Sequence, residues 1–306
     1  MSYSKELKSE LYVSVKTTFK SKCCRSALLT GLLLFTNTFT HEKIKSITES
    51  ESVAKLTIKL LKEFGLTPNL YETEKKNDGE IYLNYKITVP VRREVESLIK
   101  ELGYGSDEPL DHIKRELITC DKCSHALIMG AFLAGGFVNP PENAYHLEIT
   151  TSNEALCRDF ADYLSECGLP AKVTTRKSSS LVYYKESAGI EDFLYYIGSQ
   201  KALFDLMNVK IFRDLRNNAN RAANCDAANI DKVISASKLH IESIKMLIED
   251  GRIELLSSDL RMTATLRLEN SEATLAELAA LHDPPITKSG VNHRLKKIIE
   301  FANGQK

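Results

Sequence analysis

The first 200 residues of this chain contain an internal repeat, and this repeat limits the available folds more than any other feature. In each copy an apolar helix leads to a strand, and an amphipathic helix, two strand-like runs and a last helix follow. The glycines of the two apolar helices, Gly31 and Gly130, lie 99 positions apart, and the glycines that end the amphipathic helices, Gly65 and Gly168, lie 103 apart. Glycine is the preferred residue just past a helix end, so both copies end their amphipathic helix in the same way. We predict two similar halves related by a pseudo-two-fold axis, with the apolar helices packed at the centre.

The elements of both copies follow from hydrophobic spacing and turn residues. The first copy covers about 23–102, with helices at 23–35, 51–64 and 91–102, strands at 69–74 and 80–89, and Asn77-Asp78-Gly79 as a hairpin turn. The second copy covers about 124–200, with helices at 124–135, 153–167 and 189–196 and strands at 145–150, 171–176 and 180–185.

Charge and hydropathy exclude binding by bulk electrostatic attraction and a membrane-spanning segment. Lys+Arg and Asp+Glu are 41 each, so the whole body cannot bind nucleic acid or anionic membrane by bulk attraction, although a local basic patch remains open. Residues 1–16 lack the apolar core of a secretory signal. The longest apolar stretches, 27–35 and 126–138, fall short of the roughly 20 residues that span a bilayer. We expect a cytoplasmic, nucleoid-associated protein with no membrane partner.

The seven cysteines show no disulfide framework. Cys23 and Cys24 are adjacent and neighbours rarely bridge, so we expect reduced thiols. Cys120 and Cys123 have the spacing of a zinc knuckle and His125 is close, but no second Cys/His pair follows downstream. We therefore predict a short polar connector here, with no metal and no other cofactor. No phosphate loop, nucleophile elbow or H-E-x-x-H motif occurs, so we predict no catalytic residues.

A run of Arg and Asn side chains interrupts the helical region at 201–255. At about 100° per residue, one arc of about 140° holds six of them: Arg213, Arg216, Asn217, Asn220, Arg221 and Asn224. Asparagine is a poor helix former, so three on one face need an explanation. The face is either solvated, or part of a buried amide network at a domain contact, or a DNA contact, because Arg and Asn bond to base edges and reach phosphates.

The last segment, residues 256–306, has the pattern of a helix-turn-helix. We expect a helix at 258–268 and a short helix ending at 281, which Thr274 opens with capping-box spacing to Glu277. After Asp283-Pro284-Pro285, Thr287 caps a third helix at 288–302. The core stripe of that helix is predicted to be Val291, Leu295, Ile298 and Ala302.

The third helix carries the candidate DNA-reading residues. The side away from the stripe presents Ser289, Asn292, His293, Lys296 and Lys297, and Lys288, the first residue of the helix, is added to them. Residues 286–306 hold five basic residues and one acidic residue, a local charge of +4 on a neutral chain. We predict that this helix enters a major groove of double-stranded DNA. The alternative is a small helical bundle with a solvated basic face.

The two apolar helices resemble a known motif. Residues 128–136 and, more loosely, 29–37 are similar to the LAGLIDADG motif of homing endonucleases. In those enzymes an acidic residue near the end of each motif binds the divalent metal ions that activate water. The matching positions here are Thr36 and Gly135, and neither has a carboxylate. The resemblance implies a scaffold that has kept its shape and lost its cutting chemistry. The alternative is a core helix pair and nothing more.

Four segments together resemble the WhiA family of bacterial sporulation and cell-division regulators: 4–11, 130–136, 221–229 and 289–297. The resemblance covers essentially the whole chain and implies an α+β fold, in which a duplicated LAGLIDADG-like αββαββα domain precedes an all-α helix-turn-helix domain. The implied division is an N-terminal helical segment at 1–22, the degenerate LAGLIDADG-like domain at 23–200, a helical connector at 201–255 and the helix-turn-helix domain at 256–306.

The same resemblance implies a sequence-specific DNA-binding transcriptional regulator of sporulation or cell division, without nuclease activity. Its partners would be double-stranded DNA and a protein co-regulator. Two rival functions stay open at this point: an active LAGLIDADG-type endonuclease, and an adaptor whose large domain binds a protein partner.

Overall fold

The computed structural model describes residues 2–77, 80–177 and 179–304. The chain forms two compact units, the first ending at Phe212 and the second beginning at Arg213. The boundary falls inside helix α8 (Gln200–Glu249). Asp78 and Gly79 of the predicted hairpin turn lie outside the described residues.

The first unit contains the predicted duplication. The first copy consists of α2 (Lys22–Leu34), β1 (Thr38–Phe39), β2 (Ile44–Thr48), α3 (Glu51–Glu63), β3 (Asn69–Asn77), β4 (Glu80–Val89) and α4 (Arg92–Glu101). The second consists of α5 (Asp121–Gly135), β5 (Gly136–Val138), β6 (Leu147–Thr151), α6 (Glu154–Glu166), β7 (Lys172–Arg176), β8 (Ser179–Tyr184) and α7 (Ser187–Tyr196). Both copies are αββαββα, and their antiparallel sheets have the same strand order, β1-β2-β4-β3 and β5-β6-β8-β7. The predicted fold class is confirmed.

The two copies begin and end their amphipathic helices with the same chemistry. The Ser50 hydroxyl accepts from the Val53 N–H at the start of α3, and the Asn153 side chain accepts from the Leu156 N–H at the start of α6. Such caps satisfy N–H groups that have no partner inside the helix. Both helices end at a glycine in the left-handed region, Gly65 with φ 79° and Gly168 with φ 78°.

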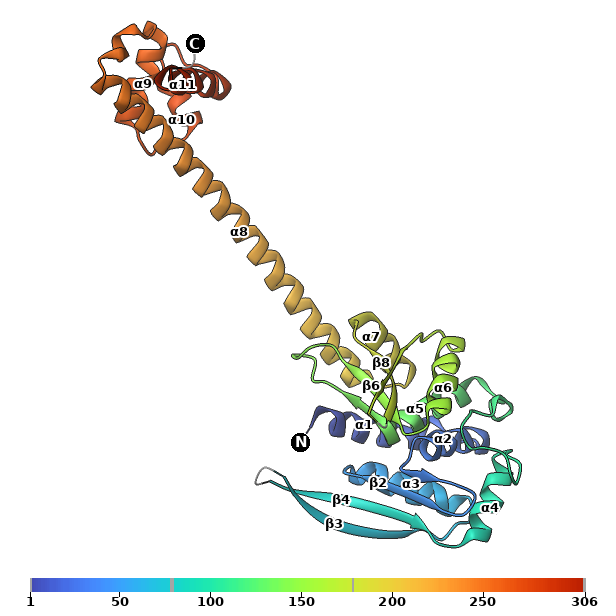
Figure 1. Ribbon diagram of the computed structural model, residues 1–306. Coiled ribbons are helices and arrows are strands. Elements are labelled where there is room, and N and C mark those ends of the chain that lie inside the picture. Colours follow the sequence, from blue (N-terminus) through green and yellow to red (C-terminus); the bar gives the residue numbers. More distant parts are fainter. Residues whose placement is uncertain (1, 78–79, 178, 305–306) are drawn as a thin grey trace. The chain divides into compact units, whose positions relative to one another are not determined.

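Helices α2 and α5 lie side by side between the two sheets (Figure 1). Their contact is so close that a Cβ atom on Gly31 would lie 2.0 Å from the Leu127 carbonyl oxygen. A Cβ on Gly130 would lie 2.3 Å from the Leu28 carbonyl oxygen. Only glycine allows two backbones to approach this closely, which explains the paired glycines in the repeat.

The first unit includes more of the chain than the repeat itself. Helix α1 (Tyr3–Thr18) contributes Leu7, Leu11 and Val15 to its core. The buried Ser4 hydroxyl donates to the Val138 carbonyl over 2.8 Å and accepts from the Val138 N–H over 2.9 Å, which ties α1 to β5. The start of α8 also belongs to this core through Ala202 and Leu206. Between the copies lies a short 3-10 helix, η1 (Arg115–Leu117).

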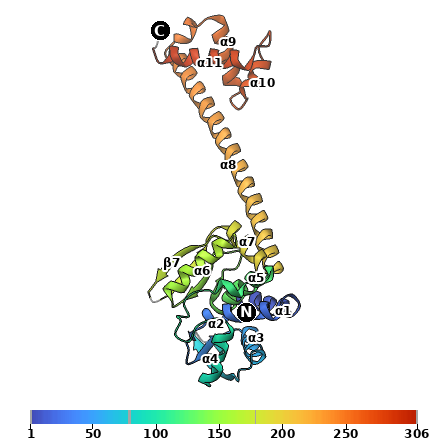
Figure 2. The same ribbon diagram turned by 90° about the vertical axis from the view of Figure 1, so that its right-hand side faces the viewer.

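All regular elements in the described residues of the second unit are helices. After the remainder of α8 come η2 (Arg252–Leu255), α9 (Ser258–Glu269), α10 (Leu275–Ala280) and α11 (Lys288–Ala302), and the last three form one compact group (Figure 2). The predicted core stripe of α11 is confirmed, because Val291, Leu295, Ile298 and Ala302 are all buried. They pack in one cluster with Ile244 and Leu247 of α8. Across the described parts of the chain, no helix has the length and apolar character that crossing a membrane requires.

Candidate nucleic-acid interface

Hydrogen bonds set the starts of the two helices that make up the predicted DNA-binding motif. In α10 the Thr274 hydroxyl accepts from the Glu277 N–H, and the Glu277 carboxylate accepts from the Thr274 N–H over 2.7 Å. The Thr274 N–H, followed by the Thr274 side chain, holds the pKa of the Glu277 carboxylate below its ordinary value. In α11 the Thr287 hydroxyl accepts from the Gly290 N–H over 3.1 Å. The capping box and the Thr287 cap predicted from the sequence are therefore both confirmed.

The turn between α10 and α11 is tied to α9 by a buried histidine. The His282 Nδ1 donates to the Leu278 carbonyl over 2.8 Å, and its Nε2 lies 2.9 Å from the Thr263 hydroxyl. At the surface, the Arg294 guanidinium donates to the Asp259 carboxylate over 3.1 Å. These contacts and the buried stripe hold α11 at one angle on α9 and α10.

The predicted DNA-reading residues all lie on the exposed side of α11: Lys288, Ser289, Asn292, His293, Lys296 and Lys297. The Lys296 ammonium lies 4.0 Å from the Glu300 carboxylate, a loose pair with both side chains in solvent. Two of the six, Lys288 and Asn292, also line a hollow of about 480 Å³. Arg267 of α9 and Lys232 of α8 line the same hollow. The surface offers several hydrogen-bond donors and a positive charge, as contact with phosphates and base edges requires.

The predicted Arg/Asn face lies on α8, around the boundary between the units. Arg213 is half-buried, and the side chains of Arg216, Asn217, Asn220 and Arg221 are exposed. No polar partner within the described part of the second unit buries the asparagine side chains, which are exposed. A solvated face and a DNA contact both fit this geometry.

The two positions that match the metal-binding acids of LAGLIDADG enzymes are used for packing. The Thr36 hydroxyl donates to the Lys45 carbonyl over 3.3 Å. A Cβ atom on Gly135 would lie 2.4 Å from the Thr150 carbonyl oxygen, so any larger residue there requires the β6 backbone to shift. Neither position can hold a divalent cation as an acidic residue does.

The outward faces of the two sheets mix basic and apolar side chains. Alternation along β4 points Ile87 and Val89 into the core and Lys86 outward, where its ammonium lies 5.7 Å from the centre of the Tyr71 ring. On the other sheet, the outward Arg176 donates to the Glu148 carboxylate over 3.2 Å.

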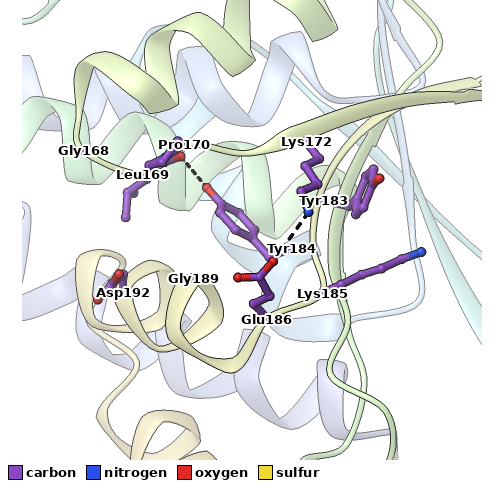
Figure 3. A pocket seen from close by; sticks show the side chains of 10 residues that line it. All are labelled: Gly168, Leu169, Pro170, Lys172, Tyr183, Tyr184, Lys185, Glu186, Gly189 and Asp192. Atoms are coloured by element: carbon purple, nitrogen blue, oxygen red, sulfur yellow. Dashed lines mark hydrogen bonds and ion pairs between the residues drawn. The ribbon is translucent and has the colours of Figure 1, made fainter.

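A pocket of about 290 Å³ lies where β7, β8 and α7 meet (Figure 3). The Tyr184 hydroxyl donates to the Leu169 carbonyl over 2.7 Å, and the Lys172 ammonium lies 3.5 Å from the Glu186 carboxylate at the rim. The residues that line it include no serine, cysteine or histidine. The lining therefore offers no pair of the Ser–His or Cys–His kind.

Four cysteines meet at the starts of the two central helices, a site that the sequence prediction missed. Cys23 and Cys24 begin α2, and Cys120 and Cys123 begin α5; the four Sγ atoms all lie within 4.8 Å of one another. The prediction of no metal rested on the lack of a second pair downstream of Cys120, but the second pair lies upstream. The repeat held the signal, because Cys24 and Cys123 lie 99 positions apart, as Gly31 and Gly130 do.

His125, which the sequence placed near this site, has another role. Its Nδ1 donates to the Tyr196 carbonyl over 2.7 Å, and its ring stacks on the Tyr196 ring with centroids 4.0 Å apart.

Family models match the second repeat and most of the C-terminal part of the chain, and relatives align with nearly all of the chain. The family model "WhiA LAGLIDADG-like domain" matches residues 124–216, and "WhiA C-terminal HTH domain" matches residues 219–302. The chain is 37% identical over 312 residues to a probable cell division protein WhiA of Clostridium botulinum strain Hall, covering 99% of this chain and 98% of that one. The protein of the same name in Desulforamulus reducens is 36% identical over 313 residues, covering 99% and 95%. The crystal structure of full-length DUF199/WhiA from Thermatoga maritima matches with a TM-score of 0.59 and 24% identity over 99% of both chains, which supports the fold.

Proposed function

The chain belongs to the WhiA family, and from this premise we propose that it is a sequence-specific DNA-binding transcriptional regulator of cell division and sporulation. It acts at the nucleoid, in the cytoplasm, and does not cut DNA. The observation that carries the proposal is α11, a helix packed firmly on one side and exposed on the other, where six polar or basic side chains stand together.

The side chains of α11 divide into two roles in this proposal. Lys288, Lys296 and Lys297 contact phosphates, which sets affinity and the response to salt. Asn292 and His293 reach base edges in the major groove, and an asparagine amide is well suited to the two groups that adenine presents there. Because the chain has no net charge, its electrostatic attraction to DNA is confined to local basic surfaces such as that of α11. Contacts with base edges then supply more of the discrimination between DNA sequences.

The test is a binding measurement on the full chain with DNA fragments selected from random sequence. His293→Ala is expected to weaken binding to the selected sequence by about 1–3 kcal/mol and to leave non-specific binding little changed. Lys297→Ala is expected to weaken binding to all sequences and to reduce the slope of log K against log salt by about 1. Lys62→Ala removes the same charge from an exposed position on α3 and serves as the control. Equal affinities for all four proteins would remove α11 from the interface.

The proposed lack of nuclease activity rests on Thr36 and Gly135. Neither residue has a carboxylate at the end of the central helix pair. The Thr36 hydroxyl is hydrogen-bonded to the backbone, and Gly135 packs against the Thr150 carbonyl. Supercoiled plasmid incubated with the protein and Mg²⁺ or Mn²⁺ is expected to remain intact. Cleavage that EDTA abolishes would support the rival endonuclease function.

We propose a protein co-regulator as a second partner, bound by the first unit. Three outward-facing apolar side chains on the sheets support it, since Ile47, Tyr71 and Phe137 are all exposed. The same sheet face carries lysines, so further DNA is the competing ligand. Crosslinking of the full chain in cells, with and without nuclease treatment, separates the two: a crosslinked protein that persists after DNA removal supports the co-regulator, and loss of every crosslink contradicts it.

A further inference from the structure

The four-cysteine cluster is built by the same packing that joins the two repeats. Helices α2 and α5 come closest at Gly31 and Gly130, and Cys24 and Cys123 each precede one of these glycines by seven residues. Both helices begin at this end, so their first turns lie together. Cys24 and Cys123 are buried and occupy equivalent places in the two copies, whereas Cys23 and Cys120 add one sulfur each from nearby positions that differ between the copies.

The distances between the sulfur atoms match one small cation. The Cys120 Sγ lies 3.8 Å from that of Cys23, 3.5 Å from that of Cys24 and 3.4 Å from that of Cys123. With Zn–S bonds of about 2.3 Å, the ligands of a regular tetrahedron lie about 3.8 Å apart. We propose that Cys23, Cys24, Cys120 and Cys123 bind one Zn²⁺ in a closed structural site that joins the two repeats.

The chemistry of the donors selects zinc among common cations. Four soft sulfur ligands in a tetrahedral arrangement suit Zn²⁺ and exclude Mg²⁺ and Ca²⁺, which take oxygen ligands. A site with four protein ligands leaves no position for water, so its role is structural and not catalytic. Each thiol that is protonated releases its proton when the metal binds.

The four cysteines share one position in their helices. All of them lie at the N-terminal ends of α2 and α5, where the helix dipole stabilises negative charge. The Ser21 hydroxyl lies 3.2 Å from the Cys23 Sγ, within reach of a sulfur ligand at the edge of the cluster.

The site has a consequence for the whole first unit. The metal joins positions 23–24 to positions 120–123, close to the start of each copy, and because the site exists only in the folded unit, the free energy of metal binding adds to its stability. Loss of the metal is therefore expected to loosen the pairing of α2 and α5 at this end.

The test is metal analysis of the full chain purified under reducing conditions, incubated with ZnCl₂ and dialysed. Elemental analysis is expected to find one zinc per chain, and Co²⁺ in its place is expected to give the strong visible bands of tetrahedral thiolate coordination. Cys120→Ser is the main variant, because serine is a favoured residue at the helix start that Cys120 occupies and so preserves α5. Cys225→Ser, at an exposed cysteine of α8 outside the cluster, is the matched control.

The control is expected to keep one zinc per chain. Cys120→Ser is expected to bind zinc more than about 100-fold more weakly, because loss of a residue that only supports a ligand already lowers metal affinity by about 10–100-fold. Tyrosine fluorescence shows whether the variant is folded. If it is not, Cys23→Ser, at a half-buried position, takes its place. The proposal is overturned by wild-type chain that holds no zinc, by iron in place of zinc, or by a cysteine variant that retains wild-type zinc affinity.

Discussion

Replacing Gly130 by alanine tests the claim that the two repeats are joined through backbone contact of α2 and α5. The added Cβ would lie 2.3 Å from the Leu28 carbonyl oxygen and 2.9 Å from the Leu32 nitrogen. Ordinary contact begins near 3.4 Å, so the helices must separate by about 1 Å. Both opposing atoms belong to the backbone, so no side chain can rotate away.

The expected cost follows from two opposing effects. Overpacking a core costs about 1–3 kcal/mol and occasionally more, and rigid backbone on both sides favours the upper end. Alanine is a better helix former than glycine by about 1 kcal/mol, which offsets part of this. We expect a net destabilisation of at least about 2 kcal/mol. For a unit of this size each kcal/mol lowers Tm by roughly 2–4 °C, so the drop should be about 4 °C or more.

The chain provides its own assay. It has no tryptophan, and all 12 tyrosines precede residue 213, so tyrosine fluorescence reports unfolding of the first unit alone. Gly105→Ala is the control in the same unit, because its Cβ would meet the Glu108 side chain at an ordinary 3.5 Å. The urea midpoint is expected to fall for Gly130→Ala and to stay near wild type for Gly105→Ala. Equal midpoints for wild type and Gly130→Ala would refute the close packing of α2 and α5.

Two further predictions concern the second unit. The Thr274 N–H and hydroxyl lower the pKa of Glu277, so the ionised carboxylate stabilises the folded unit. This stabilisation is fully present above the ordinary carboxyl pKa of 4.5 and is lost as pH falls through the lowered pKa. Glu277→Gln is therefore expected to flatten the acid dependence of hydrogen-exchange protection in α10, and an unchanged acid profile would contradict the capping role. His282→Ala removes a buried ring with two hydrogen-bonded nitrogens and is expected to cost about 2–3 kcal/mol. Exchange protection across α9–α11 and DNA affinity should fall together, although His282 is not on the α11 surface; wild-type affinity would show that the turn does not position α11.

Local signals predicted most of the fold. Thr274, Glu277 and Thr287 are caps whose partners lie three residues away, so the helices of the second unit could be placed from the sequence. The duplication could be placed as well, because each copy ends its amphipathic helix at a glycine with positive φ.

Features that depend on distant contacts could not be predicted from local patterns. The short strand β5 begins at Gly136 and is held in place by pairing with β6 and by Ser4, which is 134 positions from its partner Val138. The buried Arg267 looks like a surface residue in sequence, yet its guanidinium donates to the Ala273 carbonyl over 2.6 Å inside the α9–α10 turn. The cysteine cluster was missed for the same reason: its two pairs are about 100 residues apart and become neighbours only through the packing of α2 and α5.

Genome-wide mapping of DNA bound by the full chain in cells tests whether α11 reads DNA sequence. The measurement compares wild-type protein with His293→Ala and with the control Lys62→Ala, at equal protein levels. We predict discrete sites that share a sequence for wild type and the control, and loss of those sites for His293→Ala. Recovery of the same sites with the same enrichment in His293→Ala would show that α11 does not read the sequence.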